Sequence, residues 1–181
     1  TDIESVIDRE ANVDVLLDLI NQGALPERIT HNDTKLNNVM IDDTTGKAIC
    51  VVDLDTVMPG SVLYDFGDMV RTATSPALED ERDLSKVTMQ IDMFDALVDG
   101  YWKSARDFLC DIERDHLAFS GKLLALMIGI RFLTDHLEGD VYFKTHRTDH
   151  NLDRARNQFQ LVRSMEEQEE AMDVVVKKRC V

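Results

Sequence analysis

A His, an Asp and an Asn near the front of this chain have a spacing that suits phosphoryl transfer. His31, Asp33 and Asn38 form the pattern His-x-Asp-x-x-x-x-Asn, and Asp53 and Asp55 follow a later apolar run. Phosphoryl transfer from ATP requires one carboxylate to orient the attacking hydroxyl, and an amide and a second carboxylate to hold magnesium. The pattern therefore predicts the catalytic half of a small-molecule kinase.

A short β-hairpin is expected to bring these side chains together. Residues 39–41 and 48–52 are predicted as strands joined by a turn. A hairpin places its two ends side by side, so Asn38 and Asp53 are expected to share one cation. The competing interpretation is structural: Asp33 and Asn38 are then turn or cap residues, and Asp53 is a carboxylate at a strand end.

The rest of the chain is predicted to be helical, because apolar residues recur at helical spacing. The segment 117–137 is the most apolar and is expected to be central and buried on most sides. The expected helices span residues 3–22, 64–72, 87–102, 117–137 and 150–172, with a loop at 58–60 and a fraying end at 174–181. The predicted fold class is mostly α (α+β), in one domain over residues 1–181 with a small hairpin near the front.

Composition excludes several classes of partner. The net charge is −15, which repels nucleic acid and anionic membranes and favours a neutral or cationic acceptor. Most of the excess acidic residues, however, are explained by solvated faces of helices. No apolar run approaches the roughly 20 residues needed to cross a bilayer. With its acidic N-terminus, the chain is expected to be cytoplasmic. Cys50, Cys110 and Cys180 form no C-x-x-C pair, which argues against a disulfide framework or a zinc site, and Cys50 is expected to be buried.

The segment from His31 to Asn38 resembles the catalytic-loop motif of the aminoglycoside phosphotransferase and choline kinase superfamily, which has a protein-kinase-like fold. The resemblance implies that Asp33 is the catalytic base, that Asn38 and Asp53 bind Mg²⁺, and that ATP is the co-substrate. Asp55 is expected to be a second carboxylate near the metal. Asp53 is followed by Leu54 and Asp55, whereas protein kinases have the D-F-G motif at this point. Small-molecule kinases share this departure.

A closer resemblance, to the N-acetylhexosamine 1-kinase group, is carried by four runs: THNDTKLNN (30–38), VDLDTVMPG (52–60), YDFGD (64–68) and RFLTDHLEGDVY (131–142). It implies phosphorylation of the anomeric hydroxyl of N-acetylglucosamine or N-acetylgalactosamine, with Arg131 and Tyr142 contacting the sugar beside Asp33. The residues alone leave two alternatives equally open: Arg131 forms an ion pair with Asp135 instead of contacting the sugar, and Tyr142 is a core residue.

Other residues near the motif are expected to give structural support. Asp65 and Asp68 look like structural carboxylates of this family, with Asp65 capping the helix that begins near Phe66. His31 is expected to hydrogen-bond backbone atoms of the catalytic loop. Lys35 contacts either the phosphoryl group or a loop carboxylate, and the sequence does not decide between them.

The sequence contains no Gly-rich loop, no Val-Ala-x-Lys strand and no Walker motif. It is therefore expected to be the C-terminal lobe of a kinase-like fold without the N-terminal nucleotide lobe. Alone, this lobe is expected to be inactive. It is also expected to self-associate through the surface that the N-terminal lobe would cover. Three alternatives remain open: a choline or aminoglycoside-type kinase, a hydrolase that processes glycans, and a non-catalytic binding module.

Overall fold

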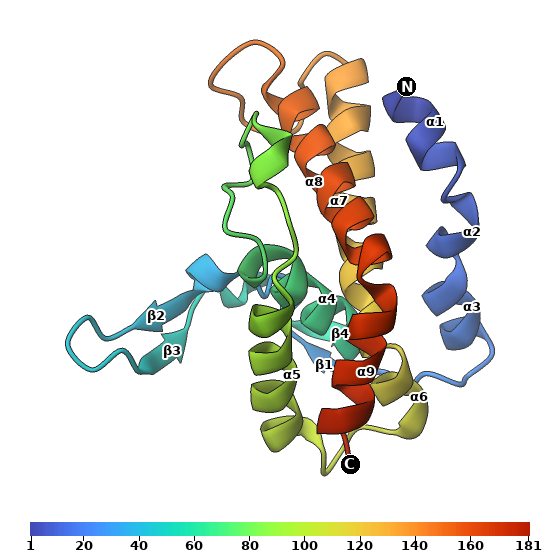
Figure 1. Cartoon of the computed structure of the whole chain (residues 1–181), viewed down its shortest axis with the longest axis vertical. Coiled ribbons are helices and arrows are strands. Elements are labelled where there is room, and N and C mark those ends of the chain that lie inside the picture. The colour runs from blue at the N-terminus through green and yellow to red at the C-terminus, as the bar shows by residue number, and fades with distance from the viewer.

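The computed structural model describes all 181 residues, which form a mostly helical structure with two small antiparallel sheets (Figure 1). The helices are α1 (Asp2–Ile7), α2 (Glu10–Val13), α3 (Val15–Asn21), α4 (Val62–Ala73), α5 (Ile91–Ala105), α6 (Asp111–Asp115), α7 (Leu117–Leu137), α8 (His150–Glu167) and α9 (Glu169–Arg179). The strands are β1 (Arg28–Thr30), β2 (Val39–Ile41), β3 (Ala48–Val51) and β4 (Met58–Gly60). Three 3-10 turns are η1 (Leu36–Asn38), η2 (Leu54–Thr56) and η3 (Leu84–Lys86). The predicted mostly helical class with a small hairpin is confirmed.

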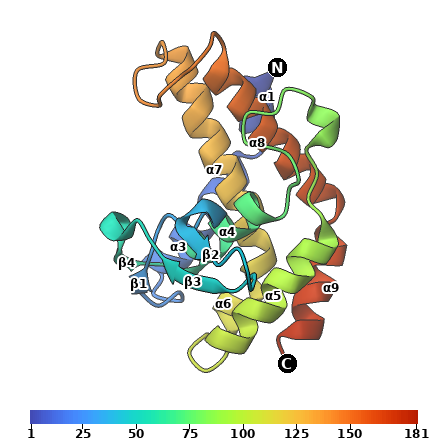
Figure 2. The same ribbon diagram turned by 90° about the vertical axis from the view of Figure 1, so that its left-hand side faces the viewer.

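Helix α7 lies at the centre of the core, as its composition predicts. Because it is apolar on most sides, it needs neighbours around it, and α4 and α8 supply them. Figure 1 shows α8 running alongside α7, and Figure 2 shows α5 and α9 side by side at the end that carries the C-terminus. The front segment of the chain packs on this helical body through contacts of β1 and η1 with α4.

Helix α7 is also long and apolar enough, by length and composition, to cross a membrane, so the expectation that no segment reaches this threshold was wrong. However, 61% of its most apolar window is buried inside the structure. A core helix passes the same test, and the packing of α7 against α4 and α8 is that of a core helix.

The two sheets lie on either side of the predicted motif. Strand β1 pairs with β4, with Arg28 opposite Gly60 and Thr30 opposite Met58. Strand β2 pairs with β3, with Val39 opposite Val51, and this hairpin projects away from the helices (Figure 1). The two ends of the hairpin therefore meet next to the helical body.

Several predictions of local structure were wrong. The expected helix 3–22 is three helices, the expected loop at 58–60 is strand β4, and the expected helix 150–172 divides at Gln168 into α8 and α9. Residues 174–181 were expected to fray, but α9 continues to Arg179, whose guanidinium bonds to Asp95 of α5.

The C-terminal end is also packed into the core, since Val176 and Cys180 are both buried. Cys50, which was expected to be buried, is exposed on the projecting hairpin.

Gly67 allows the close contact between α4 and α7. A Cβ atom at this position would lie 2.4 Å from the backbone oxygen of Ser120 on α7, which cannot move without displacing that helix. We expect Gly67→Ala to lower the free energy of unfolding by about 1–3 kcal/mol, as overpacking does. The matched control is Gly100→Ala on α5, where a Cβ meets nothing within 4 Å. It should stabilise the protein by about 0.5–1 kcal/mol. Urea unfolding measures both, and wild-type stability in Gly67→Ala would contradict the α4–α7 contact.

Candidate active site

The loop that follows β1 is held in place by one carboxylate, that of Asp65. Its two oxygens accept hydrogen bonds from the backbone N–H groups of His31 (2.8 Å) and Asn32 (2.7 Å). Asp65 lies in the first turn of α4, and α4 packs on α7, so the loop is fixed to the core. Asp65 is not the helix cap that was expected, because α4 begins earlier, at Val62, and Ser61 caps it.

The same loop is tied to the segment that follows β3. The Nε2 atom of His31 lies 3.1 Å from the carbonyl oxygen of Val52, and Thr56 Oγ1 donates to the carbonyl oxygen of His31 at 2.6 Å. Asn32 has a φ of 61° and donates from Nδ2 to the carbonyl oxygen of Thr56 at 3.1 Å. These contacts fix the position of the loop 31–38 relative to the segment 52–56.

Asp33, Lys35 and Asn38 meet at one point, and Asp53 approaches it from the far end of the hairpin. Asp33 Oδ2 accepts hydrogen bonds from Lys35 Nζ at 2.6 Å and from Asn38 Nδ2 at 2.9 Å. Lys35 Nζ also lies 3.9 Å from Asp53 Oδ2. The Lys35 ammonium therefore lies between the carboxylates of Asp33 and Asp53, and the amide of Asn38 bonds to Asp33. We call these four residues the Asp33 cluster.

The backbone helps to aim two members of this cluster. Asn38 is 6% exposed, and its Nδ2 also donates to the backbone oxygen of Asp33 at 2.8 Å, so the orientation of its amide is fixed. Asp53 has φ 62° and ψ 59°, in the left-handed region that Asn and Asp tolerate better than other side chains. Such sparsely populated conformations gather at functional sites, where the surrounding structure maintains them.

The charge state of Asp33 suits a base. Partial burial raises the pKa of its carboxyl group, but the hydrogen bonds from Lys35 and Asn38 together outweigh that effect. The pKa of Asp33 therefore lies below its ordinary value. Asp33 is ionised at neutral pH and ready to accept a hydrogen bond from a hydroxyl group.

The donor set of the Asp33 cluster fits a magnesium ion. No group of three or more His, Cys, Asp or Glu side chains is arranged to hold a metal. Magnesium, however, is usually held by one or two protein oxygens together with phosphate oxygens and water. The Asp53 carboxylate and the side-chain oxygen of Asn38 would supply two such ligands, and Lys35 Nζ, 3.9 Å from Asp53 Oδ2, places one positive charge near that carboxylate.

Asp55 and Asp68 lie outside this cluster. Asp55 is exposed on η2, with no ion pair to Lys35 or any other residue. Asp68 is buried and accepts a hydrogen bond from Arg71 Nε at 2.8 Å, while Arg71 also donates to Glu79 at 2.8 Å. Asp68 therefore fixes Arg71 rather than contacting Asp33.

Arg131 and Tyr142 are brought together, but not beside Asp33. The Arg131 guanidinium lies over the rings of Tyr142 (5.7 Å) and Phe143 (5.3 Å), in an open hollow of about 320 Å³. No residue of the Asp33 cluster lines this hollow. The alternative pairing with Asp135 does not form. Burial raises the pKa of Asp135, but the three backbone hydrogen bonds that it accepts from residues 141–143 outweigh this effect, so the pKa lies below its ordinary value.

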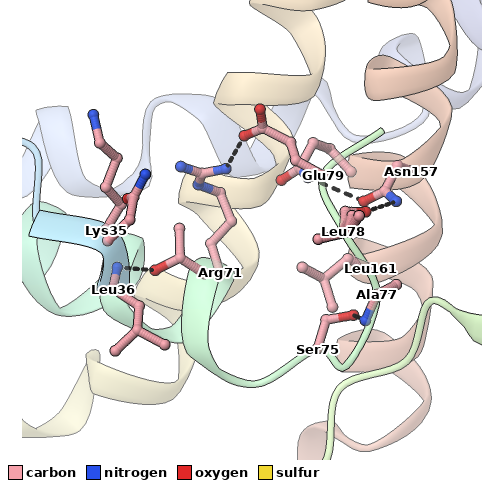
Figure 3. A pocket seen from close by; sticks show the side chains of 12 residues that line it. Lys35, Leu36, Arg71, Ser75, Ala77, Leu78, Glu79, Asn157 and Leu161 are labelled. Atoms are coloured by element: carbon pink, nitrogen blue, oxygen red, sulfur yellow. Dashed lines mark hydrogen bonds and ion pairs between the residues drawn. The ribbon is translucent and has the colours of Figure 1, made fainter. Parts of the chain in front are cut away.

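A larger cavity, of about 500 Å³, adjoins the Asp33 cluster at Lys35 (Figure 3). It lies between η1, α4, the segment 75–79 and α8, and its polar wall includes Arg71, Glu79, Asn157 and Gln158. These four residues were not predicted from the sequence. They come from three separate parts of the chain, and no local motif links them to residue 33.

Lys35→Met tests the electrostatics of the cluster. We expect the pKa of Asp33 to rise, because the substitution removes a hydrogen bond that favours the carboxylate. In the wild type, the lowered pKa of Asp33 increases the free energy of unfolding at pH values above the pKa that this carboxyl group has in the unfolded chain. This contribution is lost as the pH falls through the pKa of Asp33 in the folded protein. In Lys35→Met this contribution shrinks. Carbon-13 NMR titration of the Asp carboxyl groups measures the shift, with Lys47→Met in the hairpin turn as a control. An unchanged Asp33 pKa in Lys35→Met would contradict the contact.

Comparison with known families agrees with this geometry. Residues 3–90, just under half of the chain, match the phosphotransferase enzyme family. The matched segment includes the whole Asp33 cluster together with Asp65 and Asp68, and it ends before Arg131 and Tyr142. The part of the chain that builds the candidate site is thus similar to the phosphotransferase enzyme family, which indicates an enzyme of the kinase type.

Proposed function

We propose that the protein transfers the γ-phosphoryl group of Mg-ATP to a hydroxyl group of a small molecule. The observation that supports this proposal is that Lys35 Nζ lies 2.6 Å from Asp33 and 3.9 Å from Asp53, with Asn38 bonded to Asp33, so that residues from both ends of the hairpin come together. Positioning and charge stabilisation provide nearly all the catalysis of phosphoryl transfer, and this arrangement supplies both.

Each residue of the cluster has a role in this proposal. Asp33 accepts the hydrogen bond of the attacking hydroxyl and takes its proton. Asn38 and Asp53 would hold magnesium, whose chemistry is to neutralise charge on the phosphates. Lys35, with its ammonium 2.6 Å from Asp33 Oδ2, keeps the base ionised and lies where it can approach a phosphate oxygen. His31 and Asp65 hold the loop through backbone contacts.

For the acceptor we propose the anomeric hydroxyl of N-acetylglucosamine or N-acetylgalactosamine. The support is the likeness of residues 30–38, 52–60, 64–68 and 131–142 to the N-acetylhexosamine 1-kinase group. Arg131 and Tyr142 are proposed to contact the sugar, and Asp55 to assist at the metal. The second candidate is a choline or aminoglycoside-type kinase, which the net charge of −15 favours because cationic acceptors are attracted to it.

An acceptor panel distinguishes the two candidates. The natural full-length protein is incubated with Mg-ATP and N-acetylglucosamine, N-acetylgalactosamine, choline or an aminoglycoside, and each product is identified by phosphorus-31 NMR. We expect a 1-phosphate of an N-acetylhexosamine, and its yield should fall in Arg131→Ala. Phosphorylation of a cationic acceptor alone would transfer the assignment to the second candidate.

We propose further that these 181 residues act as the C-terminal lobe of a kinase-like fold. The hairpin and the segment after it expose many apolar side chains, which a second lobe would cover: Met40, Ile41, Ile49, Val51, Leu54, Val57 and Met58. We therefore expect negligible turnover from the 181-residue chain alone, and concentration-dependent self-association through this apolar surface. Turnover of about 1–100 per second, usual for kinases, would contradict the proposal. A monomer at all concentrations in sedimentation would contradict the self-association.

A further inference from the structure

Asp53 is held in an unusual backbone conformation by the residues on either side of it. Its φ of 62° and ψ of 59° lie in the left-handed region, which costs free energy for every residue except glycine. The Asp53 carboxylate does not cap the turn η2 that follows, and its ion pair with Lys35 spans 3.9 Å. Such a conformation persists only when the surrounding structure maintains it, so the neighbouring contacts decide where this carboxylate lies.

On the N-terminal side of Asp53, Val52 is tied to the loop 31–38 through both of its backbone groups. Its N–H donates to the carbonyl oxygen of Asn38 at 2.9 Å, and its carbonyl oxygen lies 3.1 Å from His31 Nε2. Because a carbonyl oxygen only accepts hydrogen bonds, Nε2 carries the proton of the His31 ring. The bond to Asn38 extends the pairing of β2 with β3, so the hairpin itself sets the position of the chain just before Asp53.

On the C-terminal side of Asp53, the first tie to the same loop is Thr56. Its Oγ1 donates to the carbonyl oxygen of His31 at 2.6 Å, and its own carbonyl oxygen accepts from Asn32 Nδ2 at 3.1 Å. Thr56 is half-buried, whereas every other residue of the stretch 51–59 is exposed. Residues 53–56 therefore form a short arch, and both of its ends are fixed on the loop that carries the candidate base.

The Asn32 amide that bonds to Thr56 is itself held in place. Thr30 Oγ1 donates to Asn32 Oδ1 at 3.0 Å, so Oδ1 faces Thr30 and Nδ2 faces Thr56. A Cβ atom at Gly60 would lie 3.2 Å from Asn32 Oδ1, so strand β4 leaves this amide little room to move. The C-terminal end of the arch is thus attached to a part of the loop whose own position is determined.

We propose that Thr56 is a positioning residue for the phosphoryl-transfer site. Its hydroxyl group fixes the arch 53–56, keeps Asp53 in the left-handed conformation and so holds the Asp53 carboxylate beside Lys35. Without this bond, Asp53 can relax to an ordinary backbone conformation that turns its carboxylate away from the Asp33 cluster. The effect on metal affinity rests on the proposed function, whereas the effect on the Asp53 backbone does not.

The backbone effect is measured by NMR on the 181-residue chain without metal or nucleotide. Thr56→Val removes the hydroxyl group and keeps the shape of the side chain, and Thr56→Ser keeps the hydroxyl group. Scalar couplings that report φ should show a positive φ at Asp53 in the wild type and in Thr56→Ser, and an averaged value in Thr56→Val. A positive φ retained in Thr56→Val would overturn the proposal.

Thr45→Val is the matched control on the same hairpin. It removes a hydroxyl group that bonds to Asp42 Oδ1 at 2.8 Å in the turn between β2 and β3, far from Asp53 along the chain. The couplings of Asp53 should remain those of the wild type. An averaged φ at Asp53 in Thr45→Val as well would show that any weakening of the hairpin releases Asp53, and would overturn the specific role of Thr56.

The effect on metal affinity is measured on the full-length protein with ADP, by titrating Mn²⁺ and following the free ion by electron paramagnetic resonance. Thr56→Val should bind Mn²⁺ about tenfold more weakly, the loss expected for one hydrogen bond, and Thr56→Ser should restore the affinity. In kinetics, kcat should fall in Thr56→Val while the KM for the acceptor stays unchanged. A lower free energy of unfolding with wild-type Mn²⁺ affinity would mean a purely structural role and would overturn the proposal.

A double variant tests whether Thr56 acts through Asp53. In the Asp53→Asn background, Thr56→Val should weaken Mn²⁺ binding no further, because the ligand that Thr56 positions is already lost. Independent, additive losses would overturn the proposal. If Thr56→Val does not fold, as judged by circular dichroism, Asn32→Asp removes the other bond to Thr56 at a position whose positive φ Asp tolerates. Wild-type Mn²⁺ affinity in Asn32→Asp would likewise overturn the proposal.

Failure of the proposed function gives a different result from failure of this inference. A wild-type full-length protein that binds no Mn²⁺ with ADP and transfers no phosphoryl group would refute the proposed function. The Asp53 couplings of the 181-residue chain would still show whether the Thr56 hydroxyl group holds the arch, because they require neither metal nor turnover.

Discussion

Asp33→Asn is expected to lower kcat of the full-length protein by about 10²–10⁴-fold, the usual contribution of a positioned general base. The amide keeps the size of the side chain, but it cannot take the proton of an attacking hydroxyl. The apparent affinity for ATP should change little, because the phosphates and metal are proposed to contact Asn38 and Asp53 instead. Steady-state kinetics with ATP and acceptor varied separately measure both parameters.

The matched control is Asp43→Asn, an exposed residue in the turn of the hairpin. It changes the net charge by the same amount and should leave kcat at the wild-type value. A small effect of Asp33→Asn, comparable to that of Asp43→Asn, would show that Asp33 is a loop residue without a catalytic role. Loss of ATP affinity with an unchanged kcat would place Asp33 in nucleotide binding instead.

Asp53→Asn should be nearly as damaging, through the metal. Asn tolerates the left-handed backbone found at this position, so the fold and the hairpin should be retained. The loss of an anionic ligand should raise the magnesium concentration needed for half-maximal activity by at least about tenfold, and it should lower kcat at saturating magnesium. Initial rates measured across a magnesium titration separate the two effects.

Asp55→Asn is the informative comparison, since Asp55 lies only two residues further on. It is exposed and forms no ion pair, so we expect its effect to be much smaller than that of Asp53→Asn. If the two effects are equal, both carboxylates bind metal in the active state. An unchanged magnesium dependence in Asp53→Asn would contradict the assignment of Asp53.

Local patterns predicted the elements that depend on local sequence. The apolar stretch 117–137 predicted α7 with both ends correct, and the short strands around the 42–47 turn predicted the hairpin of β2 and β3. The hairpin brings its own ends together, so Asp53 lies 3.9 Å from Lys35, which is bonded to Asp33; the shared metal site of Asn38 and Asp53 stays a prediction. For these features the determining contacts are close in sequence.

The errors arose where distant contacts prevail. Pro59 and Gly60 are typical of a turn, yet they form β4 because β1 pairs with them from residues 28–30. The expected helix 3–22 is interrupted at Arg9, whose guanidinium bonds to Glu166 on α8. The cavity wall was missed for the same reason, since Asn157 and Gln158 have the spacing of ordinary interior positions of a helix. Only the packing of α8 against the segment 75–79 gives them a common surface.

A structure of the full-length protein with Mg²⁺ and a non-hydrolysable ATP analogue tests the proposed site most directly. We expect a magnesium ion bound by the side-chain oxygens of Asn38 and Asp53 at about 2.1 Å, with Lys35 Nζ displaced from Asp53 and Asp33 facing the acceptor side. A magnesium ion held elsewhere, or Asn38 and Asp53 pointing to opposite faces of the hairpin, would show that these residues do not form a phosphotransferase site.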